Sequence, residues 1–427
     1  MVFLGAILAA RKTNDLRYYP LAAVSIFALF AIWGFAQRVN EAIGPQFSDF
    51  FHLTASQATW TEAVFGASLF LLAIPASMFL RNFGYKLGVV FGLSSFSVGA
   101  LLLYPAIAQH EYLYFLGAVA VLGAGWTWLE TSANPLVVGL GSPDTAVRRL
   151  NLAQSCYPIG VIAGYEVGKW LARLNLSVPD GQLTQAVVRP YLLVGLCVLL
   201  AAFLIENLEF PSIATEHVGK DERIRDEISA LLARPVFRMD MLALASCIFA
   251  HSALWSIITR FAQPSALASS APPTVDLLLI MFVVYGAGRI VGTELMYRFE
   301  PNRLLAAYAA ASVALTLTAL AVGGRIGIFC LLSTNFFLSI MYPTIFATSV
   351  RSLGRLAKSA SGLLVTGMGL AASVTPLAMA FVVAISGQRM APVLPALFFG
   401  IVLIYAQTVR HEESRAEIGG RSATLAH

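Results

Sequence analysis

Charged residues are scarce in this chain of 427 residues: they make up 12% of the sequence, whereas 58% of the residues are hydrophobic. A soluble globular domain carries roughly 25% charged residues. A chain with so little charge could not cover its own surface in water. The composition therefore excludes an ordinary soluble protein and indicates one that is solvated by a lipid bilayer.

Cysteine and histidine are also sparse, and their spacing argues against metal and disulfide chemistry. The four cysteines lie singly inside apolar stretches without a CxxC pair, and the six histidines are scattered along the chain. We therefore interpret the cysteines as small buried hydrophobic residues and expect neither a metal site nor a cofactor. The loops carry no pair of nucleophile and base, which disfavours a membrane-embedded enzyme.

Long apolar stretches, by contrast, are abundant. A helix needs roughly 20 apolar residues to cross a bilayer. The sequence predicts twelve such spans, near residues 19–44, 58–80, 87–107, 112–138, 150–172, 190–208, 239–263, 275–297, 303–322, 326–349, 359–386 and 391–409. We therefore expect an all-α membrane protein with twelve transmembrane helices in two six-helix bundles. The expected parts are a bundle, a cytoplasmic linker with an amphipathic helix, a second bundle and a cytoplasmic tail, at residues 1–208, 209–238, 239–410 and 411–427.

The net charge of +5 is explained by membrane topology rather than by nucleic acid. Outside the spans or at their ends, twenty Lys and Arg residues fall on the side of the N-terminus and four on the opposite side. Cytoplasmic segments carry the excess of Lys and Arg in membrane proteins. We therefore expect a multi-pass protein of the inner (plasma) membrane with both termini cytoplasmic and no nucleic-acid partner.

The polar segment between the two sets of spans has a helical pattern. Ile224, Ile228, Leu231 and Leu232 recur at helical spacing among charged residues. This pattern predicts an amphipathic helix that lies along the inner membrane surface and links the two bundles.

The two halves of the chain carry matching features. A basic loop follows the second span at residues 81–86 and the eighth span at residues 298–303, and prolines fall inside the fourth and tenth spans, at Pro135 and Pro343. Six spans, a polar bridge and six more spans form the layout of the major facilitator superfamily, whose halves are repeats around a site at the middle of the membrane. We expect this fold, with both prolines serving packing or gating.

Ionisable side chains in the middle of a span are costly and mark functional sites. The first span holds Arg38 and Glu41 on one helix face, and the fourth holds Glu130 more than one turn from either end. The fifth span opens with Asn151 and Gln154. We expect Glu130 to be the principal proton site; the alternative is a structural acid that neighbouring hydroxyl groups satisfy.

The second half supplies imidazole, aromatic and amide side chains within its spans: His251, Trp255, Asn335 and Tyr342. Arg289 lies in a run of small residues in the eighth span, where helices approach each other closely. We assign Arg289 to packing and gating rather than to solute contact. An acid in one half that faces stacking and hydrogen-bonding groups in the other favours a proton-coupled carrier of a polar organic solute.

Six stretches, in order along the chain, carry a resemblance to a known family: parts of 33–47, then 129–135, 149–154, 288–293, 304–308 and 339–346. With them the chain resembles the L-fucose–proton symporter branch of the major facilitator superfamily, which includes glucose/galactose carriers. The strings Glu-Thr-Ser-Ala-Asn-Pro and Arg-Leu-Asn-Leu-Ala-Gln are specific to this branch. The resemblance implies that Glu41 and Glu130 are the protonatable pair and that Gln154 holds the sugar.

Four positions depart from the family pattern. Glu41 stands where the fucose carriers have Asp, Arg38 and Tyr157 each stand where they have an amide, and His251 replaces a glutamine. The proton pair is kept in type, whereas the sugar pocket is rebuilt. We expect Arg38 to hold Glu41 ionised, so that Glu130 alone titrates during transport. The competing hypothesis is that Arg38 binds an anionic cargo directly.

Together these patterns predict a proton-coupled symporter that takes up a monosaccharide such as L-fucose, glucose or galactose, or a related polyhydroxylated solute, by alternating access. Stacking and hydrogen bonds would hold a hydroxyl-rich ring. The side chains expected to contact it are Gln154, Tyr157, Asn151, Trp255, His251, Asn335 and Tyr342. The alternatives are a carrier of an organic acid or siderophore, in either direction, and an efflux carrier for amphiphiles. The expected partners are the solute and the bilayer, with the proton as coupling ion and the protein as a monomer.

Overall fold

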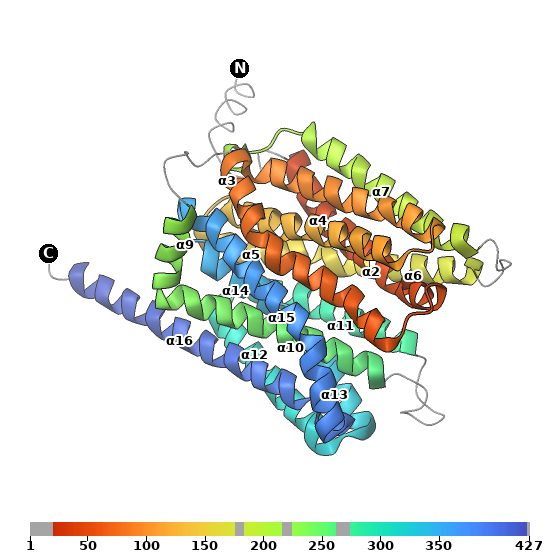
Figure 1. The fold of residues 1–427 in the computed structure, drawn as a ribbon. Helices are drawn as coiled ribbons and strands as arrows, with labels where there is room; N and C mark the ends of the chain where they lie inside the picture. The colour runs from red at the N-terminus through yellow and green to blue at the C-terminus, as the bar shows by residue number, and fades with distance from the viewer. Residues whose placement is uncertain (1–19, 176–182, 216–223, 262–273, 425–427) are drawn as a thin grey trace. The chain divides into compact units, whose positions relative to one another are not determined.

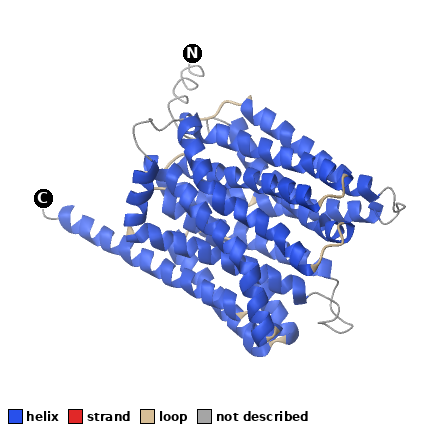
Figure 2. Cartoon of the chain, viewed as in Figure 1, coloured by secondary structure: helices blue, strands red, loops and turns tan. Residues whose placement is uncertain are grey.

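The computed structural model describes residues 20–175, 183–215, 224–261 and 274–424, and every regular element within these ranges is helical (Figure 1; Figure 2). Eight of the described helical segments are long and apolar enough to cross a membrane, and two shorter apolar helices, Pro20–Ala36 and Tyr191–Glu206, accompany them. The chain packs as two compact units. Unit 1 consists of Met1–Leu231 and Ala347–Val374, and unit 2 of Leu232–Phe346 and Thr375–His427.

Unit 1 contains most of the helices of the first half of the chain. They are α2 (Pro20–Phe50), α3 (Ala55–Ala108), α4 (Tyr112–Gly139), α5 (Ala146–Gln154), α6 (Cys156–Asn175), α7 (Leu183–Glu206), α8 (Ser212–Thr215) and most of α9 (Ile224–Ala233). The helix α3 begins at a capping box, in which the Thr54 side chain accepts from the Gln57 backbone and Gln57 Oε1 accepts from the Thr54 backbone at 2.9 Å.

The helix α3 contains both the second and the third expected spans. Within it, Gly84 leaves helical geometry, with φ 81° and ψ 172°. Glycine adopts this left-handed conformation without the strain that a Cβ would impose. The loop that we expected over residues 81–86 is therefore wrong in extent: a single glycine reverses the chain, and helix continues on both sides of it.

The remaining helices belong to unit 2 or are divided between the units. They are α10 (Pro235–Phe261), α11 (Thr274–Leu295), α12 (Pro301–Val322), α13 (Gly324–Leu338), α14 (Met341–Val350), α15 (Ala357–Ser386) and α16 (Val393–Thr424). The division falls inside α14 and α15, because residues 347–374 pack with unit 1. All twelve expected spans fall on helices, the fifth on α5 and α6 and the tenth on α13 and α14.

Small residues let the helices of unit 1 approach each other closely, as is usual in membranes. A Cβ on Gly160 in α6 would lie 1.8 Å from the carbonyl oxygen of Ala31 in α2. A Cβ on Gly369 in α15 would lie 2.4 Å from the backbone nitrogen of Phe70 in α3. Any larger side chain at either glycine would therefore push the two backbones apart.

The expected linker helix is present as α9, but its buried face differs from the expected one. Glu227 and Leu231 are buried, whereas Leu232 is 38% exposed. Glu227 Oε1 pairs with Arg81 Nη2 at 3.1 Å, and Glu227 Oε2 accepts from the hydroxyl of Ser359 at the start of α15. A buried carboxylate thus fixes α9 to unit 1, in place of the purely apolar stripe that the spacing predicts.

Candidate functional site

Glu130 lies in the middle of α4, where only 9% of its surface is exposed. Asn134 follows it by one helical turn, on the same helix face, and is fully buried. Asn134 Nδ2 donates to Oε2 of Glu130 at 2.5 Å and to the main-chain carbonyl of Glu130 at 3.3 Å. The acid predicted to carry the proton is therefore held by the amide of Asn134, a residue to which we had assigned no role from the sequence.

Gln154 reaches the same amide from α5. Its Nε2 donates to Oδ1 of Asn134 at 2.8 Å. The helix α5 ends at Gln154, because Pro158 has no N–H to donate to the Gln154 carbonyl, and the chain turns at Ser155 before α6 begins. Two side-chain hydrogen bonds thus form a continuous chain from Gln154 through Asn134 to Glu130.

Arg149 holds the other end of α5 against α4. Its Nε donates to the Val137 carbonyl at 2.8 Å and its Nη2 to the Val138 carbonyl at 2.6 Å. These carbonyls lie in the last turn of α4, where helical donors run out, and a cation there is favourable. The helix α5 is therefore fastened to α4 at both ends, by Arg149 and by Gln154. Both residues belong to the string Arg-Leu-Asn-Leu-Ala-Gln at residues 149–154.

Aromatic rings lie one helical turn before Glu130. The Trp126 ring meets Trp33 of α2 edge-on, with 4.6 Å between centroids, and meets Phe65 of α3 edge-on at 5.7 Å. Trp33 and Trp126 are both buried. These rings add apolar faces of the kind that stack on a sugar ring, whereas our sequence-based expectation for this half includes Tyr157 as its aromatic contact.

The other expected residues of the first half are placed as follows. Asn151 is fully buried, and its Nδ2 donates to the Val147 carbonyl in its own helix at 3.0 Å. Tyr157 is half-buried in α6, where α2 crosses it. Arg38 and Glu41 lie in α2, but their side chains are outside the described part of the structure. Their mutual pairing therefore stays a prediction.

Arg289, which we assigned to packing and gating, lies in α11 of unit 2. It is 2% exposed, and its Nε and Nη2 both donate to the Ser339 carbonyl, at 2.8 and 2.5 Å. Nη2 also donates to the Tyr285 hydroxyl, and the guanidinium lies 4.7 Å from the centre of that ring. Pro343 cannot donate to Ser339, which is why this carbonyl needs another donor. Arg289 thus supplies, at the junction of α13 and α14, the donor that Pro343 lacks.

His251 and Trp255 of α10 join this cluster through aromatic contacts. His251 stacks on Tyr285 at 5.7 Å, and Trp255 meets Phe282 edge-on at 5.0 Å, in both cases between ring centroids. The rings of His251 and Trp255 are 6.4 Å apart. The imidazole therefore lies beside the tyrosine that accepts from Arg289.

Asn335 and Tyr342 lie on the broken tenth span. Asn335 is 2% exposed, and its Nδ2 donates to the Leu331 carbonyl of its own helix at 3.0 Å. The Tyr342 ring faces Phe346 with 6.0 Å between centroids. Each of these two side chains thus makes a contact with a neighbour along the same span.

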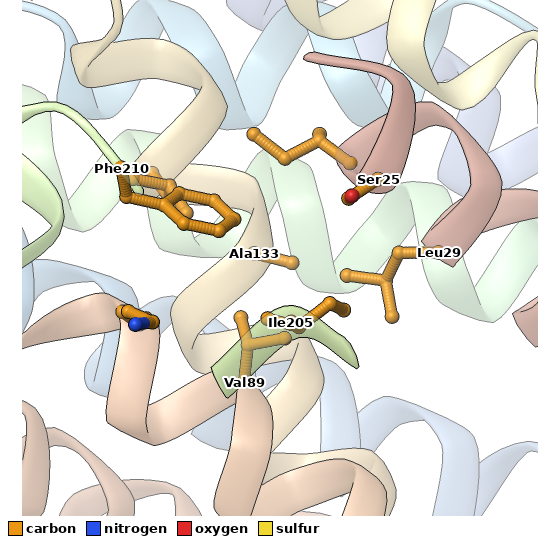
Figure 3. Close-up of a pocket in the computed structure, with 9 residues that line it drawn as sticks. Ser25, Leu29, Val89, Ala133, Ile205 and Phe210 are labelled. Carbon is orange, nitrogen blue, oxygen red and sulfur yellow. The ribbon is translucent and has the colours of Figure 1, made fainter. Parts of the chain in front are cut away.

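A small cavity of about 10 Å³ lies elsewhere in unit 1 (Figure 3). Leu29, Val89, Ile205 and Phe210 point into it, and Glu130 is not part of its lining. Lys86, at the edge of this cavity, donates to the Glu206 carbonyl at 2.6 Å. A space of this size holds roughly one water molecule. It is a packing gap among apolar side chains and not the solute site.

Membrane-spanning helices with a buried acid joined to amides define a membrane transporter, and comparison with known proteins gives its family. The model of the Major Facilitator Superfamily matches residues 19–376. The L-fucose-proton symporter of Escherichia coli (strain K12) is 32% identical over 93% of this chain and 95% of its own length. A glucose/galactose transporter of Brucella abortus (strain 2308) is 27% identical over 92% and 95%. The chain therefore belongs to the Major Facilitator Superfamily.

Solved structures agree with this assignment. The crystal structure of the transporter FucP in the outward conformation superposes with a TM-score of 0.79 at 30% identity, over 90% of this chain and 98% of that chain. The proton:xylose symporter XylE superposes with a TM-score of 0.71 at 12% identity, over 91% and 94%. The second likeness concerns the fold alone. The expected major facilitator fold is thus confirmed.

Proposed function

We propose that this protein is a proton-coupled symporter that takes up a monosaccharide, such as L-fucose, glucose or galactose, by alternating access. The observation that carries the proposal is the hydrogen-bonded chain Gln154–Asn134–Glu130. It joins an amide, which can both donate to and accept from sugar hydroxyls, to an acid that can carry a proton. Relatives named for fucose–proton symport and for glucose/galactose transport support the same function over nearly the whole chain.

Glu130 has the surroundings that a coupling acid needs. A charged carboxylate inside a membrane is costly, whereas its neutral form costs far less. The amide of Asn134 stabilises the ionised form by donating to it. Glu130 can therefore hold a proton while it is shut away from water and release it when the site opens, which is the cycle of a proton-coupled carrier.

We place the protein in the inner membrane with both termini cytoplasmic. The support is the distribution of Lys and Arg, twenty against four, between the two sides. In this arrangement residues 1–208 and 239–410 act as the two moving bundles, the segment 209–238 links them and residues 411–427 form a tail. Residues 347–374 of the second bundle group with unit 1 in this structure, so the proposal requires them to leave that unit during the cycle. The carrier works as a monomer, with the proton as coupling ion and without a cofactor.

The test is transport by purified protein in proteoliposomes, with L-fucose, D-glucose and D-galactose as labelled probes. Glu130→Gln keeps the shape of the protonated acid but cannot release a proton. We expect this variant to exchange labelled for unlabelled sugar while losing accumulation against a gradient under an imposed pH difference. Glu166→Gln, which changes an exposed acid on α6, serves as the matched control and should accumulate sugar like the parent.

Three results would argue against the proposal. Accumulation by Glu130→Gln under a pH difference would remove Glu130 as the coupling acid. If neither the parent nor Glu130→Gln exchanged a neutral sugar, a neutral sugar would be excluded as the solute. Exchange of sugar acids in their place would favour the anionic cargo that Arg38 could bind.

A further inference from the structure

We propose that Asn134 is a positioning residue that transmits the protonation state of Glu130 to Gln154, by reversing the direction of the hydrogen bonds between them. The inference rests on the proposed function, since it assigns the proton to Glu130 and the solute to Gln154. It adds Asn134, which contacts both Glu130 and Gln154. It also states how protonation of Glu130 affects solute binding at Gln154.

The observed contacts fix which way the Asn134 amide faces. Its nitrogen makes two hydrogen bonds, to Oε2 and to the main-chain carbonyl of Glu130, and its oxygen accepts from Gln154 Nε2. An ionised carboxylate only accepts hydrogen bonds, so the group facing it must be the amide nitrogen. The oxygen of Asn134 is then turned to Gln154, which must present its own nitrogen. Both hydrogen bonds, from Gln154 to Asn134 and from Asn134 to Glu130, are therefore donated toward the carboxylate.

Protonation of Glu130 removes the reason for this direction. The charge-assisted bond from Asn134 is roughly twice as strong as a neutral one, and this extra strength disappears with the charge. A protonated Oε2 becomes a donor and needs an acceptor. Asn134 supplies one by turning its oxygen to Glu130, which brings its nitrogen to face Gln154. Gln154 must then accept through its oxygen, so its amide turns over as well.

The consequence for the solute follows from the two ends of the Gln154 amide. While Glu130 is ionised, the nitrogen of Gln154 is engaged with Asn134 and its oxygen is turned the other way. Once Glu130 is protonated, the Gln154 oxygen faces Asn134 and the Gln154 nitrogen is turned away from it. Gln154 thus offers a sugar hydroxyl a different partner in each state. Coupling between two sites is reciprocal, so a proton that alters sugar binding is itself held differently when sugar is bound.

The charged side chains on the helices that pack against α4 are engaged away from this chain or lie at the far end of their helix. Arg81 pairs with Glu227, and Arg149 holds the end of α4. Among the described residues, the other charged side chains on these helices are Lys86, Arg148 and Lys358. Lys86 donates to the Glu206 carbonyl, and Lys358 lies over the Tyr85 ring. The side chains of Arg38 and Glu41 on α2 lie outside the described part of the structure.

The first experiment measures sugar affinity against pH in proteoliposomes, for whichever of L-fucose, D-glucose or D-galactose the parent exchanges. The parent should bind more tightly as the pH falls. Asn134→Leu fills the same space without an amide, so its affinity should fall roughly tenfold, as expected for one buried hydrogen bond, and should no longer vary with pH. It should exchange sugar but accumulate none. Ser132→Ala, which removes a buried hydroxyl that donates along its own helix, should keep the parental profile.

A purely structural role for Asn134 would lower affinity by the same factor at every pH and leave accumulation intact, and that result would overturn the proposal. The second experiment does not depend on sugar transport and leaves Asn134 unchanged. Infrared difference spectra of the parent between high and low pH should show side-chain amide bands that change together with the carboxyl band, both of which vanish in Glu130→Gln. A carboxyl band without amide bands would overturn the proposal even if the protein transports no sugar.

Discussion

Pro135 in α4 and Pro343 in α14 each remove a donor from a membrane-spanning helix, and the two halves satisfy the resulting carbonyl differently. In α4 the carbonyl belongs to Thr131, and the hydroxyl of Ser361 donates to it at 2.8 Å. In the tenth span the carbonyl belongs to Ser339, and it accepts two N–H groups of Arg289. The helix α4 runs on through its proline, whereas the tenth span is divided into α13 and α14.

The two contacts differ in how easily they can break: the one from Ser361 to Thr131 is easily broken, and the one from Arg289 to Ser339 is not. Inside a bilayer, a carbonyl without a donor costs several kcal/mol, so both positions need a partner. A serine hydroxyl makes a single neutral hydrogen bond and rotates freely to another acceptor. A guanidinium binds through a rigid fork of charged donors. We therefore infer that the Ser339 junction stays fixed during transport, while the contact between α15 and Thr131 can break and form again.

The largest expected effect is at Arg289. Arg289→Met keeps an unbranched apolar stem but leaves the Ser339 carbonyl and the Tyr285 hydroxyl without the donors of Arg289. The free energy of unfolding should fall by about 3 kcal/mol, in the range for hydrogen bonds to a charged group. Denaturation in SDS, followed by circular dichroism, measures this change. Arg298→Met, which alters an exposed arginine just beyond α11, is the control and should be neutral; equal losses for both variants would contradict the role of Arg289.

A smaller effect tests whether Pro343 is the reason that Arg289 is needed. Pro343→Ala restores an N–H that can donate to Ser339, so Arg289→Met should cost less in this background than in the parent. We expect a coupling of about 1 to 2 kcal/mol in the double-mutant cycle, as for residues that share a partner. Strictly additive losses would show that Arg289 stabilises unit 2 by some other contact.

The smallest effect is expected at Ser361. Ser361→Ala should lower the free energy of unfolding by about 1 kcal/mol, the usual net value of a neutral hydrogen bond. The loss should disappear when Pro135→Ala supplies a helical donor to Thr131. Thr366→Val, which removes a hydroxyl that donates within α15 itself, is the matched control. If Ser361→Ala still lowered the free energy of unfolding in the Pro135→Ala background, Ser361 would not be compensating for the donor that Pro135 removes. The comparison with Arg289 and Pro343 would then fail.

The spans could be predicted because they depend on local composition. Twenty apolar residues form a helix in a membrane whatever lies beside them, so each of the expected spans falls on a helix. The turn at residues 81–86 could not be sized, since only the structure reveals that Gly84 takes a positive φ. The buried face of α9 could not be predicted from the spacing of its apolar residues either, because the buried Glu227 is satisfied by partners from other elements.

The site was partly predictable for the same reason. Glu130 is evident from a charge inside a span, and Gln154 from the resemblance to a known family. Asn134 carries one local signal, its spacing of four residues from Glu130, which places both on one helix face. Its contact with Gln154 joins residues twenty positions apart, and that of Arg289 with Ser339 joins residues fifty apart. No local pattern specifies such pairs, because packing of the whole unit decides them.

The bridge from Glu227 to Ser359 has a consequence for biogenesis. The two residues are 132 positions apart, and the later one belongs to the stretch Ala347–Val374 that completes unit 1. At typical rates of synthesis, this length of chain takes on the order of ten seconds to leave the ribosome. Unit 1 therefore remains unfinished while most of unit 2 is being inserted, with Arg81 and Glu227 already present and Ser359 still to come. A nascent chain that is halted before residue 347 presents the translocon with an incomplete unit, however many spans it has already delivered.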